Sequence, residues 1–206
     1  MKIIKPFGPT LAKVKIPKNI INKINLEVDK IINSKKLTKK NDYSKRVVGQ
    51  VYQEIRLPDK FTNKVIKKFI TKNISSYVKK SIDQNVNNVK IKNFWVVRQF
   101  KNEYNPIHWH SGHISGAGFL KVPKTLGSHL QDKGDKKYSG GNLNLIHGSN
   151  MFLSRSMYEI KPEVGDFYFF PHYLMHTVFP FKDTKEERRS ISFNANIDEN
   201  IYNVYE

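Results

Sequence analysis

The feature that most constrains the fold is a change in hydrophobic period near residue 89. Before this point apolar residues recur at helical spacing, as in residues 20–32, which predicts amphipathic helices. After it apolar and polar residues alternate, as in residues 89–100, which predicts β-strands. Gly and Pro turns separate these strands without any helical pattern, which is typical of an antiparallel sandwich or jelly roll. The expected strands cover residues 11–16, 89–100, 114–122, 143–146, 166–170, 175–179 and 188–197.

Two amphipathic helices are expected in the first part of the chain, over residues 20–32 and 58–82. Their apolar stripes need a sheet to cover. The polar and basic residues 33–50 between them are expected to form a loop. We therefore expect a mainly β fold in which residues 1–88 are a helical support region and residues 89–200 form the β core. The helices are expected to pack on one sheet of that core.

Composition excludes several classes of protein. The 206 residues contain no cysteine, which excludes a disulfide scaffold, an iron–sulfur cluster, a thiolate zinc site and a cysteine nucleophile. No apolar run approaches the roughly 20 residues of a membrane span, and the first residues lack the apolar stretch of a signal peptide. We therefore expect a cytoplasmic protein, folded as one domain over residues 1–206, with no membrane partner.

The net charge of +18 is distributed unevenly. Residues 1–101 contain 25 Lys and Arg against 6 Asp and Glu, whereas residues 102–206 contain 11 against 12. Nearly all cations of the first part are lysines, and arginine, the better reader of phosphates and base edges, is scarce. The pattern favours a solvated surface over the packing helices, with nucleic acid as a weakly supported partner.

Histidines gather at turns and strand ends of the predicted β core. His108 and His110 stand two positions apart, so on an extended chain both imidazoles point to the same side. His176 lies in an apolar strand, where a lone imidazole would need a polar partner. The spacing predicts one metal site formed by these three residues. His113 and His172 are the neighbouring histidines that could replace one of them.

The segments around these histidines form an ordered series. In chain order it consists of His108-x-His110, Ser115-Gly116-Ala117-Gly118-Phe119-Leu120, Gly140-Gly141-x-Leu143, Pro162-x-x-Gly165-Asp166-Phe167-Tyr168-Phe169-Phe170-Pro171, His176 and Arg188-x-Ser190. The series resembles the Fe(II)/2-oxoglutarate-dependent oxygenases, and looks closest to the small prolyl-hydroxylase-like members found in bacteria and phages. The resemblance covers roughly residues 94–197, and it implies a double-stranded β-helix, a jelly-roll or cupin-like fold.

The resemblance implies a metal-binding role for three residues. In the family, a His-x-Asp or His-x-Glu pair and a distal His hold the iron. His108 matches the first ligand position and His176 the distal one. His110 stands where the family has its carboxylate, and no Asp or Glu lies between Glu103 and Asp132 to replace it. Three neutral imidazoles still bind Fe(II), zinc or nickel.

The resemblance also implies how 2-oxoglutarate is bound. In the family, an Arg that follows the distal His binds the far carboxylate of this cosubstrate. Arg188 and Ser190 fit this position, and both side chains lie on one face of the closing strand, so that they can share one carboxylate. Arg189 falls on the other face with Ile191 and Phe193, and is expected to point toward the helices.

The activity implied is that of an Fe(II)/2-oxoglutarate-dependent dioxygenase. Such an enzyme consumes 2-oxoglutarate and O2, releases succinate and CO2, and hydroxylates a second substrate, which the sequence does not identify. Two alternatives remain open. A cupin-like metalloenzyme with a three-His site accounts for His110 but gives Arg188 and Ser190 no role. A non-catalytic basic binding module on a β-helix core accounts for the lysines but not for the series of motifs.

Overall fold

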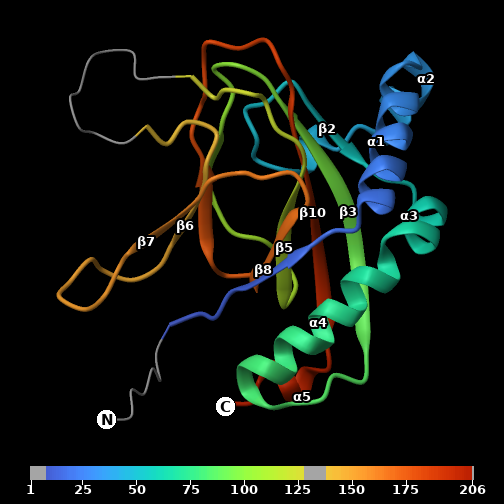
Figure 1. Cartoon of the computed structure of the whole chain (residues 1–206). Helices are drawn as coiled ribbons and strands as arrows, with labels where there is room; N and C mark the ends of the chain where they lie inside the picture. The colour runs from blue at the N-terminus through green and yellow to red at the C-terminus, as the bar shows by residue number, and fades with distance from the viewer. Residues whose placement is uncertain (1–7, 128–137, 206) are drawn as a thin grey trace.

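The computed structural model describes residues 8–127 and 138–205, and its strands form two antiparallel sheets (Figure 1). The larger sheet has the order β1-β8-β5-β10-β3-β2, and the smaller sheet has the order β4-β9-β6-β7. The strands are β1 Ala12–Lys15, β2 Gln53–Arg56, β3 Val89–Gln99, β4 Asn105–His108, β5 Ile114–Lys121, β6 Leu143–Ile146, β7 Met157–Ile160, β8 Asp166–Pro171, β9 Met175–Val178 and β10 Arg188–Ile197. Residues 128–139, whose polar sequence predicts a loop, lie mostly outside the described residues.

Helices cover the outer face of the larger sheet (Figure 1). α1 (Lys18–Ile32) and α4 (Lys67–Ile82) pack their apolar stripes against this face. Ile24 of α1 and Ile70 of α4 are fully buried in one cluster with Phe193 of β10. This arrangement confirms the predicted packing of helices on one sheet. The other helical segments are α2 Lys35–Asn41, η1 Ser44–Arg46, α3 Asp59–Val65 and α5 Glu199–Tyr202. Within the described ranges, no helix is long and apolar enough to cross a membrane.

The segment predicted as a loop over residues 33–50 is partly helical, so that prediction was wrong. It contains α2 and the short η1. α2 begins after Ser34, whose Oγ accepts a hydrogen bond from the Leu37 backbone N–H at 3.4 Å, and none of its residues is buried. A helix that depends on its cap and not on an apolar stripe leaves no periodic signal in the sequence.

The sequence did not predict three strands, β2, β4 and β7, because apolar and polar residues do not alternate regularly in them. β2 buries Glu54 beside Ile55, and β4 carries Pro106 at the edge of the smaller sheet. β7 exposes its first two residues. The helix expected over residues 58–82 is likewise divided into α3 and α4 at Ile66, which is fully buried with a φ of −122°.

The register of the larger sheet determines which residues face the smaller one. Ser190 of β10 pairs with Val97 of β3, and Val97 pairs with Glu54 of β2, so these three residues form one row across three strands. Side chains of one row point to the same face of a sheet. Alternate residues of β10 from Arg188 to Asn194 share that face, and all of them line the cavity described next.

Candidate metal centre and its pocket

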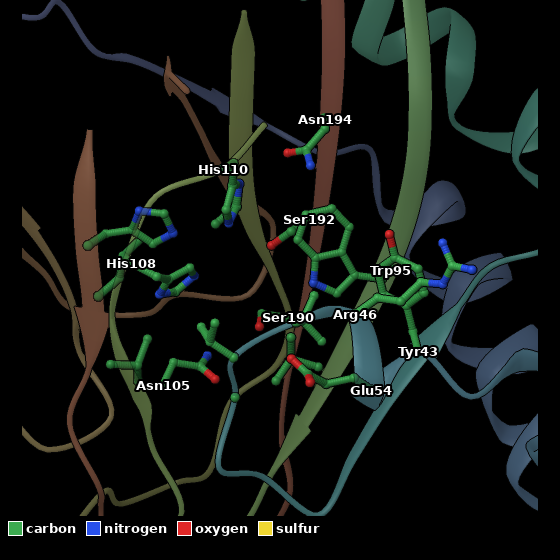
Figure 2. A pocket seen from close by; sticks show the side chains of 18 of the residues that line it. Tyr43, Arg46, Glu54, Trp95, Asn105, His108, His110, Ser190, Ser192 and Asn194 are labelled. Atoms are coloured by element: carbon green, nitrogen blue, oxygen red, sulfur yellow. The ribbon is translucent and has the colours of Figure 1, made fainter. Parts of the chain in front are cut away.

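A cavity of about 280 Å³ lies between the two sheets (Figure 2). The buried side chains of His176 and Arg188 contribute to its inner wall. Arg46, Val48 and Trp109 also line it and are exposed to solvent. The cavity is therefore open toward the η1 side of the molecule and closed at the end that holds Arg188.

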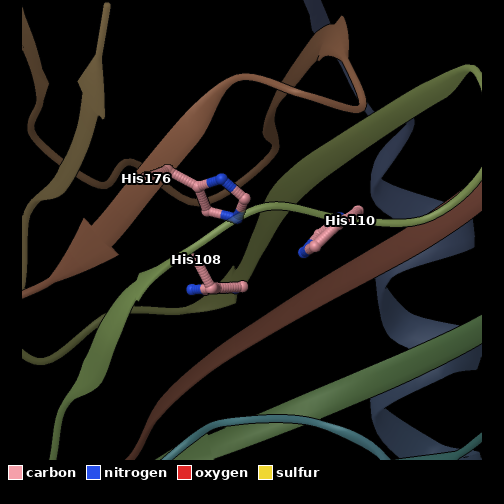
Figure 3. A group of neighbouring side chains, drawn as sticks. All are labelled: His108, His110 and His176. Carbon is pink, nitrogen blue, oxygen red and sulfur yellow. The ribbon is translucent and has the colours of Figure 1, made fainter.

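Three histidines meet in this cavity (Figure 3). His108, His110 and His176 each offer one ligand nitrogen, and these nitrogens all lie within 4.8 Å of one another. The ring centroids are 4.2 Å apart for His108 and His176, 4.7 Å for His110 and His176, and 5.3 Å for His108 and His110. The structure thus brings together the three histidines that the sequence singled out. In the described part of the chain no carboxylate belongs to this cluster.

The histidines come from two strands and one loop. His108, at the end of β4, is the register partner of His176 in β9. His110 lies beyond the end of β4, so the single extended strand assumed for His108 and His110 was wrong. The His110 backbone N–H instead donates to the backbone oxygen of His172 at 3.0 Å, and His172 Nδ1 lies 3.0 Å from the His110 carbonyl oxygen. This double link to His172 turns the His110 ring into the cavity.

Hydrogen bonds at Nδ1 determine which nitrogen of each ring is free. His108 Nδ1 lies 2.7 Å from the Pro106 carbonyl oxygen, and His176 Nδ1 lies 2.9 Å from the Leu174 carbonyl oxygen. A carbonyl oxygen only accepts, so in both rings Nδ1 carries the proton and donates it. The unprotonated Nε2 of each ring is then available as a metal ligand.

His110 is oriented by a chain of side chains. Its Nδ1 lies 2.6 Å from Ser115 Oγ, and Ser115 Oγ lies 2.6 Å from Asn194 Oδ1 and 3.1 Å from the Phe193 carbonyl oxygen. Ser115 has one hydroxyl proton, which it donates to one of these two oxygens, so its oxygen accepts from His110 Nδ1. His110 therefore has the same tautomer as the other two histidines, with Nε2 free.

Burial keeps all three imidazoles neutral near pH 7. Loss of solvent, with a smaller contribution from the neighbouring His108, lowers the pKa of His176 to about 3. Burial also lowers the pKa of His108 and holds the pKa of His110 well below its usual range. Three neutral imidazoles with their lone pairs close together form a donor set that fits Fe(II) or another divalent transition metal.

Arg188 reaches the closed end of the cavity and is 1% exposed. Its Nε donates to the Gly141 carbonyl oxygen at 2.9 Å, and its Nη1 donates to Gln99 Oε1 at 3.3 Å and Ser190 Oγ at 3.5 Å. Its guanidinium also lies 5.3 Å from the centroid of the Phe119 ring. Gly141 has a φ of +75°, which a residue with a side chain rarely adopts, so this glycine allows the turn that aims its carbonyl oxygen at Arg188.

Arg189 points to the opposite face of the sheet. Its guanidinium pairs with Glu187 at 2.7 Å and with Asp29 of α1 at 2.7 Å. Arg188 has no ion pair with any described residue, and burial lowers its pKa to about 10. The predicted phase of the closing strand is therefore confirmed: Arg188 and Ser190 face the cavity, and Arg189 faces the helices.

Sequence reasoning missed a buried carboxyl group in the same cavity. Glu54 of β2 lines it and is 2% exposed. Burial, with a smaller contribution from Asp42, raises the pKa of Glu54 to about 8. The short polar strand that carries this residue has no alternating pattern, so the sequence contained no signal that would place Glu54 near the histidines.

Two further histidines of the β core, His113 and His172, lie outside the cluster. His113 stacks on Tyr202 with ring centroids 4.0 Å apart, and its Nδ1 accepts from the Ile197 backbone N–H. His172 contacts the Tyr202 hydroxyl at 2.9 Å through its Nε2. Both therefore tie the C-terminal segment to the β core, and neither joins the three-histidine cluster.

Comparison with known proteins agrees with this architecture. A family model described as "Putative 2OG-Fe(II) oxygenase" matches residues 93–194, which include the three clustered histidines, Arg188 and Ser190. The match and the fold together indicate the class of iron- and 2-oxoglutarate-dependent oxygenases. Residues 93–194 of this chain belong to the 2OG-Fe(II) oxygenase family, whose cofactor is Fe(II) and whose cosubstrates are 2-oxoglutarate and O2.

Solved structures share the fold at low sequence identity. A prolyl-4-hydroxylase from Pseudomonas putida is 10% identical, with a TM-score of 0.57 over 89% of this chain and 91% of its own. A viral collagen prolyl hydroxylase from Paramecium bursaria Chlorella virus-1, in complex with 2-oxoglutarate, is 15% identical, with a TM-score of 0.53 over 90% and 94%. A prolyl hydroxylase from Trichoplax adhaerens is 13% identical, with a TM-score of 0.57 over 95% and 87%.

These likenesses confirm the double-stranded β-helix fold, with helices packed on one of its sheets. No curated protein matches the sequence.

Proposed function

We propose that this chain is an Fe(II)- and 2-oxoglutarate-dependent hydroxylase. In this proposal, Nε2 of His108, His110 and His176 are the protein ligands of the iron. Arg188 and Ser190 bind the far carboxylate of 2-oxoglutarate. The observation that carries the proposal is a buried guanidinium, without a counter-ion among the described residues, in the same cavity as three neutral imidazoles.

The unpaired Arg188 favours a dianionic cosubstrate. A buried charge without a partner is costly, and that cost is removed when an anion of matching geometry enters the cavity. A carboxylate can accept two hydrogen bonds from the planar guanidinium and one from the Ser190 hydroxyl. Because Gly141 and Gln99 already hold the guanidinium in place, little side-chain entropy is lost when the carboxylate binds.

Each of the other residues has a part in this scheme. Ser115 and the carbonyl oxygens of Pro106 and Leu174 fix the imidazole rings, so that three lone pairs converge before the metal enters. The closed end of the cavity keeps water away from the Arg188–carboxylate contact, which strengthens it. When bound, iron and 2-oxoglutarate supply an O2-dependent oxidation that yields succinate and CO2 and inserts one oxygen atom into a C–H bond of the second substrate.

Metal content and 2-oxoglutarate binding test this proposal together. We expect one Fe(II) per chain after anaerobic reconstitution, and 2-oxoglutarate binding that requires the metal and Arg188. The single substitutions His108→Ala, His110→Ala and His176→Ala should each lower the metal content. The exposed His147 is a matched control, and His147→Ala should leave both measurements unchanged.

The outcomes separate the proposal from its alternatives. Metal binding without 2-oxoglutarate binding would support a three-His metalloenzyme of the cupin type. Absence of both, with retention of a polyanion, would support a non-catalytic basic module. Binding of both, followed by consumption of 2-oxoglutarate and formation of succinate in the presence of O2, is the result that the proposal predicts.

A further inference from the structure

We infer that the second substrate of this site carries a primary ammonium group, which binds between Glu54 and Asn105 on the β2 side of the cavity. The inference deepens the proposed function and rests on it, because that function leaves the second substrate open. It starts from two buried side-chain oxygens that have no hydrogen-bond partner among the described residues.

Glu54 Oε2 and Asn105 Oδ1 are both buried and have no hydrogen-bond partner in the described part of the chain. Glu54 belongs to β2 of the larger sheet and Asn105 to β4 of the smaller sheet, so the two oxygens approach the cavity from opposite walls. Figure 2 shows the two side chains pointing toward each other. Buried polar atoms are nearly always paired in folded proteins, so two unpaired acceptors in one cavity indicate a missing donor.

The backbone of Gly49 lies against both of these side chains. A Cβ at this position would lie 2.6 Å from Asn105 Oδ1 and 2.8 Å from Glu54 Oε1. Both side chains therefore border the same small volume beside the Gly49 backbone. A Cβ at residue 49 would collide with both oxygens and displace these side chains, so glycine allows them to stay in place.

A cation fits this volume better than a neutral group. Burial keeps Glu54 mainly protonated near pH 7 in the ligand-free protein, and Glu54 has no ion pair with any described residue. A cation that enters beside it would supply the counter-ion that its carboxylate form lacks. An ammonium group has three donors and no acceptor, so it can satisfy both oxygens without adding an unpaired atom of its own. A prolyl residue within a peptide has no N–H and would leave both oxygens unpaired.

The position of Glu54 also fits a second substrate beside the cosubstrate. Glu54, Val97 and Ser190 lie in one row on neighbouring strands, which places the α-carbons of Glu54 and Ser190 about 10 Å apart. Val97 lies in the middle of that row, and Trp95 stands two residues before it on β3; both line the cavity, and the Trp95 ring lies 5.2 Å from the His110 ring. A short methylene chain against these apolar groups would connect the ammonium to the carbon that is oxidised.

Matched small peptides provide the test. The probes are Nα-acetyl-L-lysine N-methylamide, the norleucine analogue that lacks the ammonium, and the proline analogue. Each is titrated calorimetrically into the full chain with Fe(II) and 2-oxoglutarate in the absence of O2. We expect the lysine probe to bind at least tenfold more tightly than either analogue, and to be the probe that most stimulates succinate formation once O2 is admitted.

Two substitutions at the site and one distant control complete the test. Glu54→Gln should reduce the preference for the lysine probe at least tenfold while 2-oxoglutarate still binds. Gly49→Ala retains Glu54 but forces the Glu54 carboxyl group and Asn105 Oδ1 to shift, and should have the same effect. The control is Glu163→Gln, which removes an exposed carboxylate that pairs with Lys15 at 3.6 Å and does not line the cavity.

The results distinguish this inference from the proposed function. Equal binding of the lysine and norleucine probes, no binding of the lysine probe, tighter binding of the proline probe, or an unchanged preference in both site variants would overturn the inference. Failure of 2-oxoglutarate to bind would instead count against the proposed function. If 2-oxoglutarate does not bind, the affinities for the lysine probe and its two analogues can still be compared in the Fe(II)-loaded protein, so the inference is tested in that case too.

Discussion

Arg188 and Arg189 are consecutive residues of β10 whose guanidinium groups lie on opposite faces of the larger sheet, and within the described ranges only Arg189 has counter-ions. Arg189 joins Glu187 and Asp29 and so connects the sheet to α1. Arg188 faces the cavity, where it has no counter-ion among the described residues. The two residues therefore differ in role: Arg189 stabilises the packing of the helix, and Arg188 can bind a ligand.

Substitution of these two arginines should separate ligand binding from stability. Arg188→Ala should weaken 2-oxoglutarate binding roughly tenfold or more, because a charged hydrogen bond in a dry pocket contributes about 1.5–3 kcal/mol. Arg189→Ala should leave that affinity nearly unchanged but lower the free energy of unfolding by about 1.5–3 kcal/mol, because it removes charged hydrogen bonds to Glu187 and Asp29, while Glu187 keeps its pair with Arg98 at 2.8 Å. Calorimetric titration and denaturant unfolding measure the two effects. A greater loss of 2-oxoglutarate affinity in Arg189→Ala than in Arg188→Ala would show that Arg189 is the residue that binds the cosubstrate.

Ser115→Ala should weaken metal binding without unfolding the protein. The hydroxyl oxygen of Ser115 accepts a hydrogen bond from His110 Nδ1–H and so fixes both the tautomer and the orientation of that ring. Loss of such a supporting hydrogen bond typically costs 10–100-fold in metal affinity. Ser192→Ala is a matched control, since Ser192 lines the same cavity from β10. Equal affinity in Ser115→Ala and wild type, measured by competition with a chelator, would argue against this role.

The buried Glu54 should make the stability of the ligand-free protein depend on pH. Burial raises the pKa of Glu54 to about 8, above its value of about 4.5 in the unfolded chain, so the folded state binds the proton more tightly. Stability from this group is complete below pH 4.5 and is lost as the pH rises toward 8. Compared with Glu54→Gln, wild type should therefore lose on the order of 2–5 kcal/mol of unfolding free energy between pH 5 and 8. If the unfolding free energies of wild type and Glu54→Gln changed with pH in the same way, the pKa of Glu54 would not be raised by folding.

The lysine-rich first half should bind nucleic acid only weakly. Exposed lysines such as Lys64, Lys67, Lys68 and Lys72 lie on the solvent side of α3 and α4, between buried apolar positions. We expect micromolar or weaker affinity for random DNA or RNA, falling steeply with salt, and a further decrease when these four lysines are changed to glutamine. Nanomolar affinity at about 0.2 M salt, measured by fluorescence anisotropy, would contradict this expectation.

Much of the fold could be predicted because the apolar periods are strong. The strand that contains Phe94 and Val96 and the helix that contains Ile24 and Val28 both follow from spacing alone. The elements that were missed lack that signal. α2 depends on the Ser34 cap and buries none of its residues, and β2 is short and polar.

The candidate site was predictable where the local sequence marks a residue, as the apolar strand around His176 does. His108 and His110 are close in the chain, and Arg188 with Ser190 follows from strand alternation. The tautomers of the histidines depend on contacts such as Ser115 with His110, which no local pattern specifies. Glu54 reaches the cavity only because β2 pairs with β3.

The measurement that tests the central claim most directly is a crystal structure of the Fe(II)-loaded protein with 2-oxoglutarate, grown without O2, with anomalous scattering recorded at the iron edge. We predict one iron bound by Nε2 of His108, His110 and His176, with the far carboxylate of 2-oxoglutarate on Arg188 and Ser190. An anomalous peak at any other group of side chains, or an ordered 2-oxoglutarate that leaves Arg188 without an anion, would contradict the assignment.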